Sequence, residues 1–114
     1  MNPLTYTLND ALVVALDGEL DAKSVTLLRP CFEELADAGK AVVLDLSDVS
    51  FVDSSGIGAI VFLFKRLQAR DLKVSVVGLR PQPRELFMML RIHKAILCYE
   101  SLKAFVSTQV KVAV

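Results

Sequence analysis

The sequence has very few of the residues from which metal sites and hydrolytic triads are built. Its 114 residues include one histidine, His93, and two cysteines, Cys31 and Cys98. A zinc site needs several clustered ligands, and a serine hydrolase needs a histidine beside its nucleophile, so both classes are disfavoured. His93 lies between Ile92 and Lys94, where we expect an exposed or capping side chain. The cysteines have apolar neighbours, and we expect buried free thiols in a reducing cytoplasm rather than a disulfide.

Long apolar segments and targeting signals are also missing. The N-terminus shows neither the basic region nor the apolar stretch of a signal peptide. The longest apolar run, Gly56 to Phe64, has about half of the length that spans a bilayer. We therefore expect a soluble cytoplasmic protein without membrane insertion.

The chain has no net charge, since 13 basic residues balance 13 acidic ones. Composition therefore gives no reason to expect nucleic-acid binding. The charges are unevenly distributed along the sequence: residues 1–53 contain ten acids and three bases, and residues 54–114 contain three acids and ten bases. This asymmetry indicates either a polar surface or solvated charges without a role.

The hydrophobic pattern predicts an α/β fold in a single domain over residues 1–114, with its core at about 4–107. An apolar content of 54% excludes disorder and fits strands that are covered on both faces. Strands are predicted at 4–8, 11–16, 41–46, 72–77 and 95–99, and helices at 22–38, 55–69, 81–91 and 101–108. This alternation implies a mostly parallel central sheet of about four to five strands, with an N-terminal antiparallel hairpin strand and about four flanking helices.

Several local features of these elements are predicted as well. Pro30 should kink or split the first helix near Leu28, because proline removes a helical hydrogen bond. Residues 17–21 are predicted to form a loop and residues 47–50 a turn. Ser101 is a candidate cap for the final helix, which Val110 to Val114 either extend or leave frayed.

The segment Asp53-Ser54-Ser55-Gly56-Ile57-Gly58 joins a predicted strand to a predicted helix. A helix start carries unpaired N–H groups and partial positive charge, so a serine there is either a simple cap or a site for phosphate. A hydrolase nucleophile elbow would need glycine where Val52 stands. The segment also lacks the third glycine of a dinucleotide fingerprint, and the chain has no Gly-Lys-Ser/Thr phosphate loop.

Glycine is a poor helix residue, so Gly56 and Gly58 in the first turn need a reason. We expect them to leave the serine hydroxyl unshielded and to let another protein approach the backbone. On the following helix, Phe62 and Leu63 lie away from the main apolar face at helical spacing. They either pack under another element or form a docking surface beside the serine.

Two segments carry a resemblance to a known family. Residues 53–58, with the preceding residues 44–52, are similar to the signature of STAS domains, above all those of bacterial anti-sigma factor antagonists. Residues 18–21, Gly-Glu-Leu-Asp, match a second motif of that family at the expected distance upstream. The likeness extends over about residues 4–105. The chain departs from the family at Pro30 and after the third main helix, where the family often carries a glycine and this chain has Arg91-Ile92-His93.

The resemblance implies a partner switch without catalytic activity, cofactor or metal. The unphosphorylated protein would bind an anti-sigma factor that is also a serine kinase of the histidine-kinase-like ATPase fold. Phosphorylation of Ser54, with Ser55 as the second candidate, would release it, and a PP2C-type phosphatase would reset it. The implied partner-binding residues are Glu19, Asp21, Asp53, Ser55, Gly56, Ile57, Gly58, Phe62 and Leu63. We expect a monomer when the protein is free.

Other functions remain open from the sequence. A STAS subunit of a lipid-transport or stress-sensing assembly would keep the fold but have no phosphorylation cycle, and Ser54→Asp would then have no effect. A small nucleotide-binding protein would respond to nucleotide titration, and an enzyme is the remaining alternative.

Overall fold

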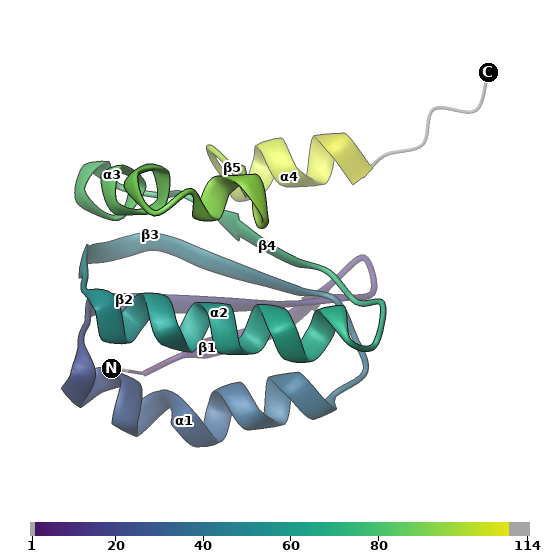
Figure 1. The fold of residues 1–114 in the computed structure, drawn as a ribbon. Coiled ribbons are helices and arrows are strands. Elements are labelled where there is room, and N and C mark those ends of the chain that lie inside the picture. Colours follow the sequence, from purple (N-terminus) through teal and green to yellow (C-terminus); the bar gives the residue numbers. More distant parts are fainter. Residues whose placement is uncertain (1, 110–114) are drawn as a thin grey trace.

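The computed structural model describes residues 2–109, and the chain folds into one α/β domain (Figure 1). Its elements are β1 (Leu4–Leu8), β2 (Ala11–Leu20), α1 (Ala22–Asp37), β3 (Val42–Val52), α2 (Ser54–Gln68), β4 (Val74–Val77), α3 (Pro81–Met89), the 3-10 turn η1 (Ile92–Lys94), β5 (Leu97–Tyr99) and α4 (Leu102–Gln109). Val110 to Val114, the predicted extension or frayed end, lie outside the described residues.

The five strands form one sheet in the order β1-β2-β3-β4-β5. β1 pairs antiparallel with β2, and every other neighbouring pair is parallel. Asn9 and Asp10 join β1 to β2 with φ angles of 49° and 67°, a conformation that asparagine and aspartate tolerate in tight hairpins. The predicted fold class, including the N-terminal hairpin, is confirmed.

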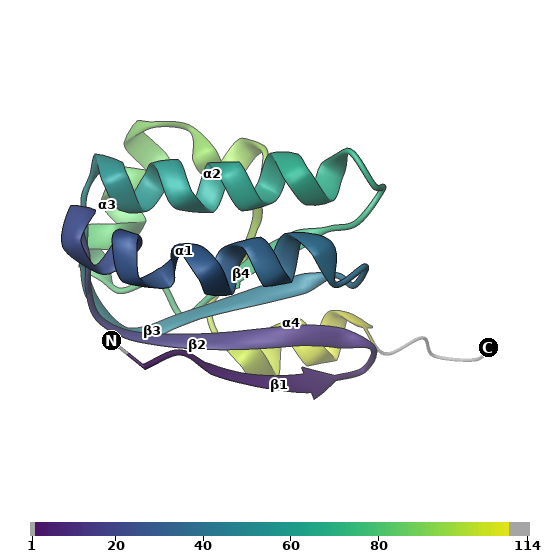
Figure 2. The same cartoon turned by 90° about the horizontal axis from the view of Figure 1, so that it is seen from below.

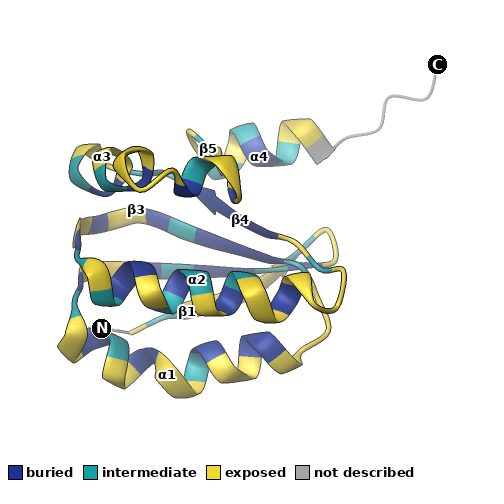
Figure 3. Ribbon diagram, in the orientation of Figure 1, coloured by how far each residue is buried: buried dark blue, intermediate teal, exposed yellow. Residues whose placement is uncertain are grey.

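The helices cover both faces of the sheet. Figures 1 and 2 show α1 and α2 side by side on one face, and α4 on the other. Side chains alternate along β3: Val42 and Leu44 join the core under α1 and α2, whereas Val43 joins the core under α4. Figure 3 shows β3 and β4 largely buried between these layers. α3 adds Phe87 to the first core and contacts the end of β3.

Two predicted loops belong to strands. β2 extends to Leu20 and β3 extends to Val52, because the two strands stay paired through two register shifts. β-Bulges of this kind leave the extra residue out of the ladder, and the polar segment then continues the strand. The predictions of a loop at 17–21 and a turn at 47–50 were therefore wrong.

The predicted split of the first helix near Leu28 was wrong, because α1 runs without interruption with Pro30 inside it, whereas the alternative, a kink, stays a prediction. Pro30 is exposed, and the helix is anchored by the buried residues Leu28, Phe32 and Leu35. Burial of this apolar face offsets the lost hydrogen bond, since packing provides most of a helix's stability in a protein. The predicted ends are confirmed at Gly39, which has φ +75°, and at Ser101, whose Oγ accepts from Ala104 N at 3.0 Å.

Candidate functional site

The two sequence motifs meet at one edge of the sheet. β2 and β3 end together, with Leu20 opposite Val52, and Asp53 N donates to Leu20 O at 3.2 Å. Each strand leads directly into a helix, β2 into α1 and β3 into α2. Parallel pairing therefore places Glu19 and Asp21 beside Asp53 and Ser54, although the sequence separates them by about thirty residues.

Asp53 caps α2, so of the two alternatives for the serines, the simple cap is taken by another residue. The Asp53 side chain accepts from Gly56 N at 3.0 Å, and Asp53 O accepts from Ile57 N at 3.0 Å. Ser54 is the first helical residue and its side chain is exposed. The N–H groups of Ser54 and Ser55 have no acceptor within residues 2–109. The Ser54 hydroxyl therefore lies exposed beside two unpaired N–H groups. This end of the helix favours negative charge.

Asp21 caps α1 in the same way. Asp21 Oδ1 accepts from Ser24 N at 3.0 Å, and Asp21 N donates to Ser24 Oγ at 2.9 Å, which completes a capping box. Ser24 Oγ also donates to Glu19 O at 2.8 Å, so this buried serine links the end of β2 to the start of α1. Hydrogen bonding from the Ser24 N–H lowers the pKa of the Asp21 carboxyl.

This pKa shift predicts a defined dependence of stability on pH. Because the folded-state pKa of Asp21 is lowered, its contribution is present above the ordinary aspartate pKa of about 3.9 and is lost as the pH falls through the folded-state pKa. A carboxyl NMR titration of Asp21 should give a midpoint below the ordinary value. Ser24→Ala keeps the backbone N–H and removes only the smaller contribution of the hydroxyl, so it should raise that midpoint slightly. A wild-type midpoint at or above the ordinary value would contradict the assigned cause.

Gln82 holds the end of β3 from the side. Its Oε1 accepts from Val52 N at 2.9 Å and its Nε2 donates to Val52 O at 2.9 Å, so the amide pairs with the strand as another strand would. Val52 is fully buried and directly precedes the cap Asp53. Gln82 was missed by the sequence analysis, because a residue thirty positions away carries no local signal of this contact.

Removing the Gln82 amide should loosen the start of α2. Gln82→Leu should lower the free energy of unfolding by about 2 kcal/mol, since it leaves two partly buried backbone groups of Val52 unpaired. Gln82→Glu keeps the acceptor for Val52 N but sets a carboxylate oxygen against Val52 O, so it should also be destabilising, and less so at low pH, where the protonated carboxyl can donate. Urea denaturation of both variants tests this, and equal stability of Gln82→Leu and the wild type would contradict it.

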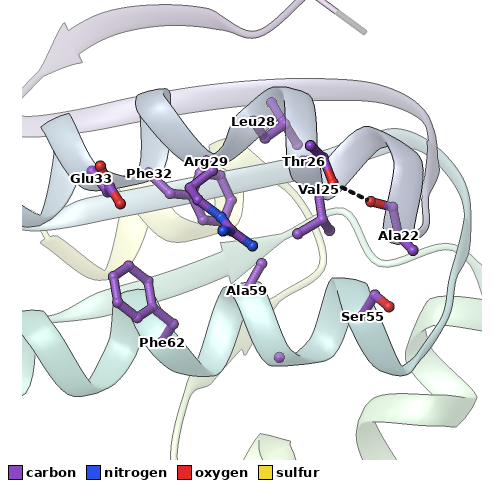
Figure 4. A pocket seen from close by; sticks show the side chains of 11 residues that line it. Ala22, Val25, Thr26, Leu28, Arg29, Phe32, Glu33, Ser55, Ala59 and Phe62 are labelled. Carbon is purple, nitrogen blue, oxygen red and sulfur yellow. Dashed lines mark hydrogen bonds between the residues drawn. The ribbon is translucent and has the colours of Figure 1, made fainter.

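A groove between α1 and α2 begins at Ser55 (Figure 4). Its volume is about 570 Å³, and Figure 4 shows Phe62 at the opposite end from Ser55, with Arg29 reaching between the helices. Phe62 is 39% exposed. The Cζ atom of Arg66 lies over the Phe62 ring, 5.5 Å from the ring centre. Arg66 also forms an ion pair with Asp37 of α1 at 3.1 Å. Of the two serines, Ser55 lines this groove and Ser54 does not.

Three predicted contact residues are buried in the core instead. Leu63 has no exposed surface, Ile57 is 8% exposed, and both belong to the main core cluster. Gly56 is buried against β2: a Cβ there would lie 2.5 Å from Leu20 O and 2.9 Å from Val52 Cγ1. The predicted role of Gly56 in admitting a partner was therefore wrong, since its missing side chain admits the chain's own strand. Gly58 is exposed with open space around it, as predicted.

The remaining candidates for chemistry lie elsewhere. His93 is half-buried and does not cap a helix, and its Nδ1 has no hydrogen-bond partner among the described residues. Cys31 is half-buried and Cys98 is exposed, which corrects the expectation of two buried thiols. Burial raises the pKa of both thiols, so neither is activated as a nucleophile. No group of three or more metal-binding side chains occurs within residues 2–109.

The described helices include none that is long and apolar enough to cross a bilayer. Acidic residues gather where β2 and β3 end, at Asp17, Glu19, Asp21, Asp48 and Asp53. Four basic residues, Arg80, Arg84, Arg91 and Lys94, lie in α3 and in the segments on either side of it.

The sequence motifs and the fold match a known protein family. The family model described as STAS domain matches residues 2–105. The chain belongs to the STAS domain family. It is 28% identical over 92 residues to an anti-sigma F factor antagonist of Paenibacillus polymyxa, covering 79% of each chain. It is 31% identical over 88 residues to an anti-sigma-B factor antagonist of Staphylococcus epidermidis, covering 76% of this chain and 82% of that one.

Solved structures confirm the STAS fold. An anti-sigma factor antagonist from Mycobacterium paratuberculosis superposes with a TM-score of 0.85 at 22% identity, covering 94% of this chain and 92% of that one. The Bacillus cell fate determinant SpoIIAA in its phosphorylated form gives a TM-score of 0.72 at 20% identity, covering 95% and 100%. SpoIIAA in its unphosphorylated form gives 0.74 at 19% identity, covering 95% and 96%.

Proposed function

We propose that this STAS protein is an anti-sigma factor antagonist that is switched by phosphorylation of Ser54. The observation that carries the proposal is the exposed Ser54 hydroxyl at the first position of α2, beside the cap Asp53 and level with the Asp21 corner. The names of the relatives support the antagonist function. The two solved forms of SpoIIAA support phosphorylation as the signal.

The proposed complex forms between unphosphorylated protein and an anti-sigma factor that is also a serine kinase. Glu19, Asp21 and Asp53 form the acidic rim that the kinase contacts, and Gly58 leaves room for its backbone. Ser55 and Phe62 line the adjacent groove and extend the contact along α2. Binding removes the anti-sigma factor from its sigma factor, so the protein acts by occupying a surface and catalyses no reaction.

Phosphorylation ends the complex through local electrostatics. A phosphate adds about −1.5 to −2 charge and three acceptor oxygens. The free N–H groups of Ser54 and Ser55 tolerate this charge, so the fold is retained. A docked partner would have to strip water from a dianion beside the carboxylates of Asp53 and Asp21, which disfavours the complex. A PP2C-type phosphatase resets the cycle in the cytoplasm, and the free protein is a monomer.

The first test is phosphopeptide mass spectrometry on the protein purified from its native cells. Phosphate on Ser54 that disappears in Ser54→Ala supports the switch, and the co-purifying kinase is then available for binding experiments. Ser55→Ala is the matched control and should keep the phosphate on Ser54. Absence of phosphate in all growth conditions would refute the switch and favour a structural STAS subunit.

A further inference from the structure

The end of α3 carries three consecutive large apolar side chains that are open to solvent. Met88, Met89 and Leu90 are 56%, 69% and 50% exposed, and no other three consecutive large apolar residues within 2–109 are exposed. The core side of α3 is already formed by Pro83 and Phe87, both buried. Single exposed apolar residues are ordinary, whereas contiguous ones mark interaction surfaces.

A shallow groove lies beside these side chains. It has a volume of about 760 Å³ and is lined by Leu79, Pro81, Arg84, Glu85, Met88 and Met89. Methionine side chains are flexible and polarizable, so they adapt to apolar side chains of different shapes. A concave apolar surface of this size fits side chains that project from a helix.

One cation, Arg84, lines the groove, and three others lie in or beside α3 and η1, which contact each other. Arg80, Arg84, Arg91 and Lys94 are all exposed, and Glu85 is the only acidic residue between positions 80 and 94. None of the four forms an ion pair with another residue in the described part of the chain. We propose that this α3 surface, residues 79–94, binds an acidic amphipathic helix of a partner protein, whose carboxylates pair with these cations and whose apolar side chains enter the groove.

The backbone at Arg91 is an independent observation. Arg91 has φ +59° and ψ 26°, a left-handed conformation that favours glycine after a helix. The other positive-φ residues within 2–109 are glycine, asparagine or aspartate, which tolerate it better. A long cation at a position that favours glycine for the fold indicates a function for its charge. Figure 1 shows α3 at the outside of the domain, where a partner can reach it.

A helix of a protein fits these observations better than an anionic membrane. Glu85 lies in the groove. A uniformly anionic membrane would repel this carboxylate, whereas a partner helix can carry its own carboxylates at positions away from Glu85. The surface does not include Ser54, so this inference is independent of the proposed phosphorylation.

The test is a titration of the full chain, labelled with ¹⁵N, with two synthetic helical peptides of equal length and identical apolar positions. One peptide carries glutamate on its polar face and the other carries lysine. The glutamate peptide should shift the amide signals of residues 84–94, with an affinity that falls as salt is added. The lysine peptide should leave these signals unchanged.

Three variants separate binding from folding. Met89→Ser should weaken binding of the glutamate peptide about fivefold, as expected for an interface side chain. Arg91→Gly should weaken it about threefold, the effect of one exposed ion pair, while raising the melting temperature by relieving the left-handed backbone. Leu27→Ser is the control, because Leu27 is 65% exposed on α1, and it should leave binding unchanged.

The opposite results would overturn the proposal. Equal shifts from both peptides, or shifts that map outside residues 79–94, would exclude a charge-selective α3 surface. Binding to phosphatidylserine vesicles that is lost in Met89→Ser would assign the surface to lipid instead. Concentration-dependent changes of the same signals without peptide would assign it to a second copy of this chain.

Discussion

Gly56→Ala is expected to lower the free energy of unfolding by about 3 kcal/mol, the upper part of the range for overpacked sites. The added Cβ would lie 2.5 Å from Leu20 O and 2.9 Å from Val52 Cγ1, both closer than real Cβ contacts. The carbonyl belongs to backbone that is paired with β3 and with Asp53 N, so it cannot move without disturbing the strand. The start of α2 would have to shift away from β2, and the Ser54 corner would shift with it.

Gly58→Ala is the matched control for this variant. Gly58 is in the same helix turn, but no atom lies within 4 Å of the position that its Cβ would occupy. Alanine there should raise the free energy of unfolding by about 1 kcal/mol, because it has the higher helix propensity. Urea denaturation of both variants measures the difference. Similar stability changes in the two variants would mean that Gly56 is not a packing requirement.

Ser54→Asp is expected to weaken binding of the co-purified kinase at least about 100-fold, which corresponds to about 2.7 kcal/mol. The substitution places a permanent negative charge beside the carboxylates of Asp53 and Asp21, and the complex would have to bury it. The fold should tolerate the change, since a negative charge at the first helical position interacts favourably with the helix dipole. The melting temperature should therefore stay the same or rise slightly.

The measurement is isothermal titration calorimetry with the unphosphorylated protein and its variants. Ser54→Ala should bind as the wild type does, because it removes the hydroxyl without adding charge. Ser55→Asp should cost less affinity than Ser54→Asp, since Ser54 is the exposed serine that directly follows Asp53, whereas Ser55 is half-buried and faces the groove. Equal affinity of Ser54→Asp and the wild type would refute the electrostatic switch and leave the groove as the surface to examine.

Elements whose signals are local were predictable. The hairpin turn at Asn9 and Asp10, the C-terminal stop at Gly39 and the cap at Ser101 depend on residues within a few positions of one another. The alternation of strands and helices follows from hydrophobic period in the same way. The contributions of Pro30 and of residues 47–50 were misjudged, because tertiary burial and strand pairing outweighed their local preferences.

The site itself depended on both kinds of information. The serine segment and its place between a strand and a helix came from the sequence alone, as did the family resemblance. The division of the α2 residues into exposed and buried ones could not be predicted in this way. Leu63 and Ile57 are buried and Phe62 is exposed because of the side of α2 that faces the sheet. That orientation is set by the packing of α2 against α1 and β3, not by the periodicity of α2.

The sequence by itself determined the α/β order, the family and the serine at the start of α2, since each is written in the spacing of neighbouring residues. Only the tertiary structure decided that Gly56 makes room for Leu20, that Gln82 holds Val52, and that Met88 and Met89 remain uncovered. These facts involve residues far apart in the chain or the absence of a covering element. Both are properties of packing in three dimensions, and no local pattern encodes them.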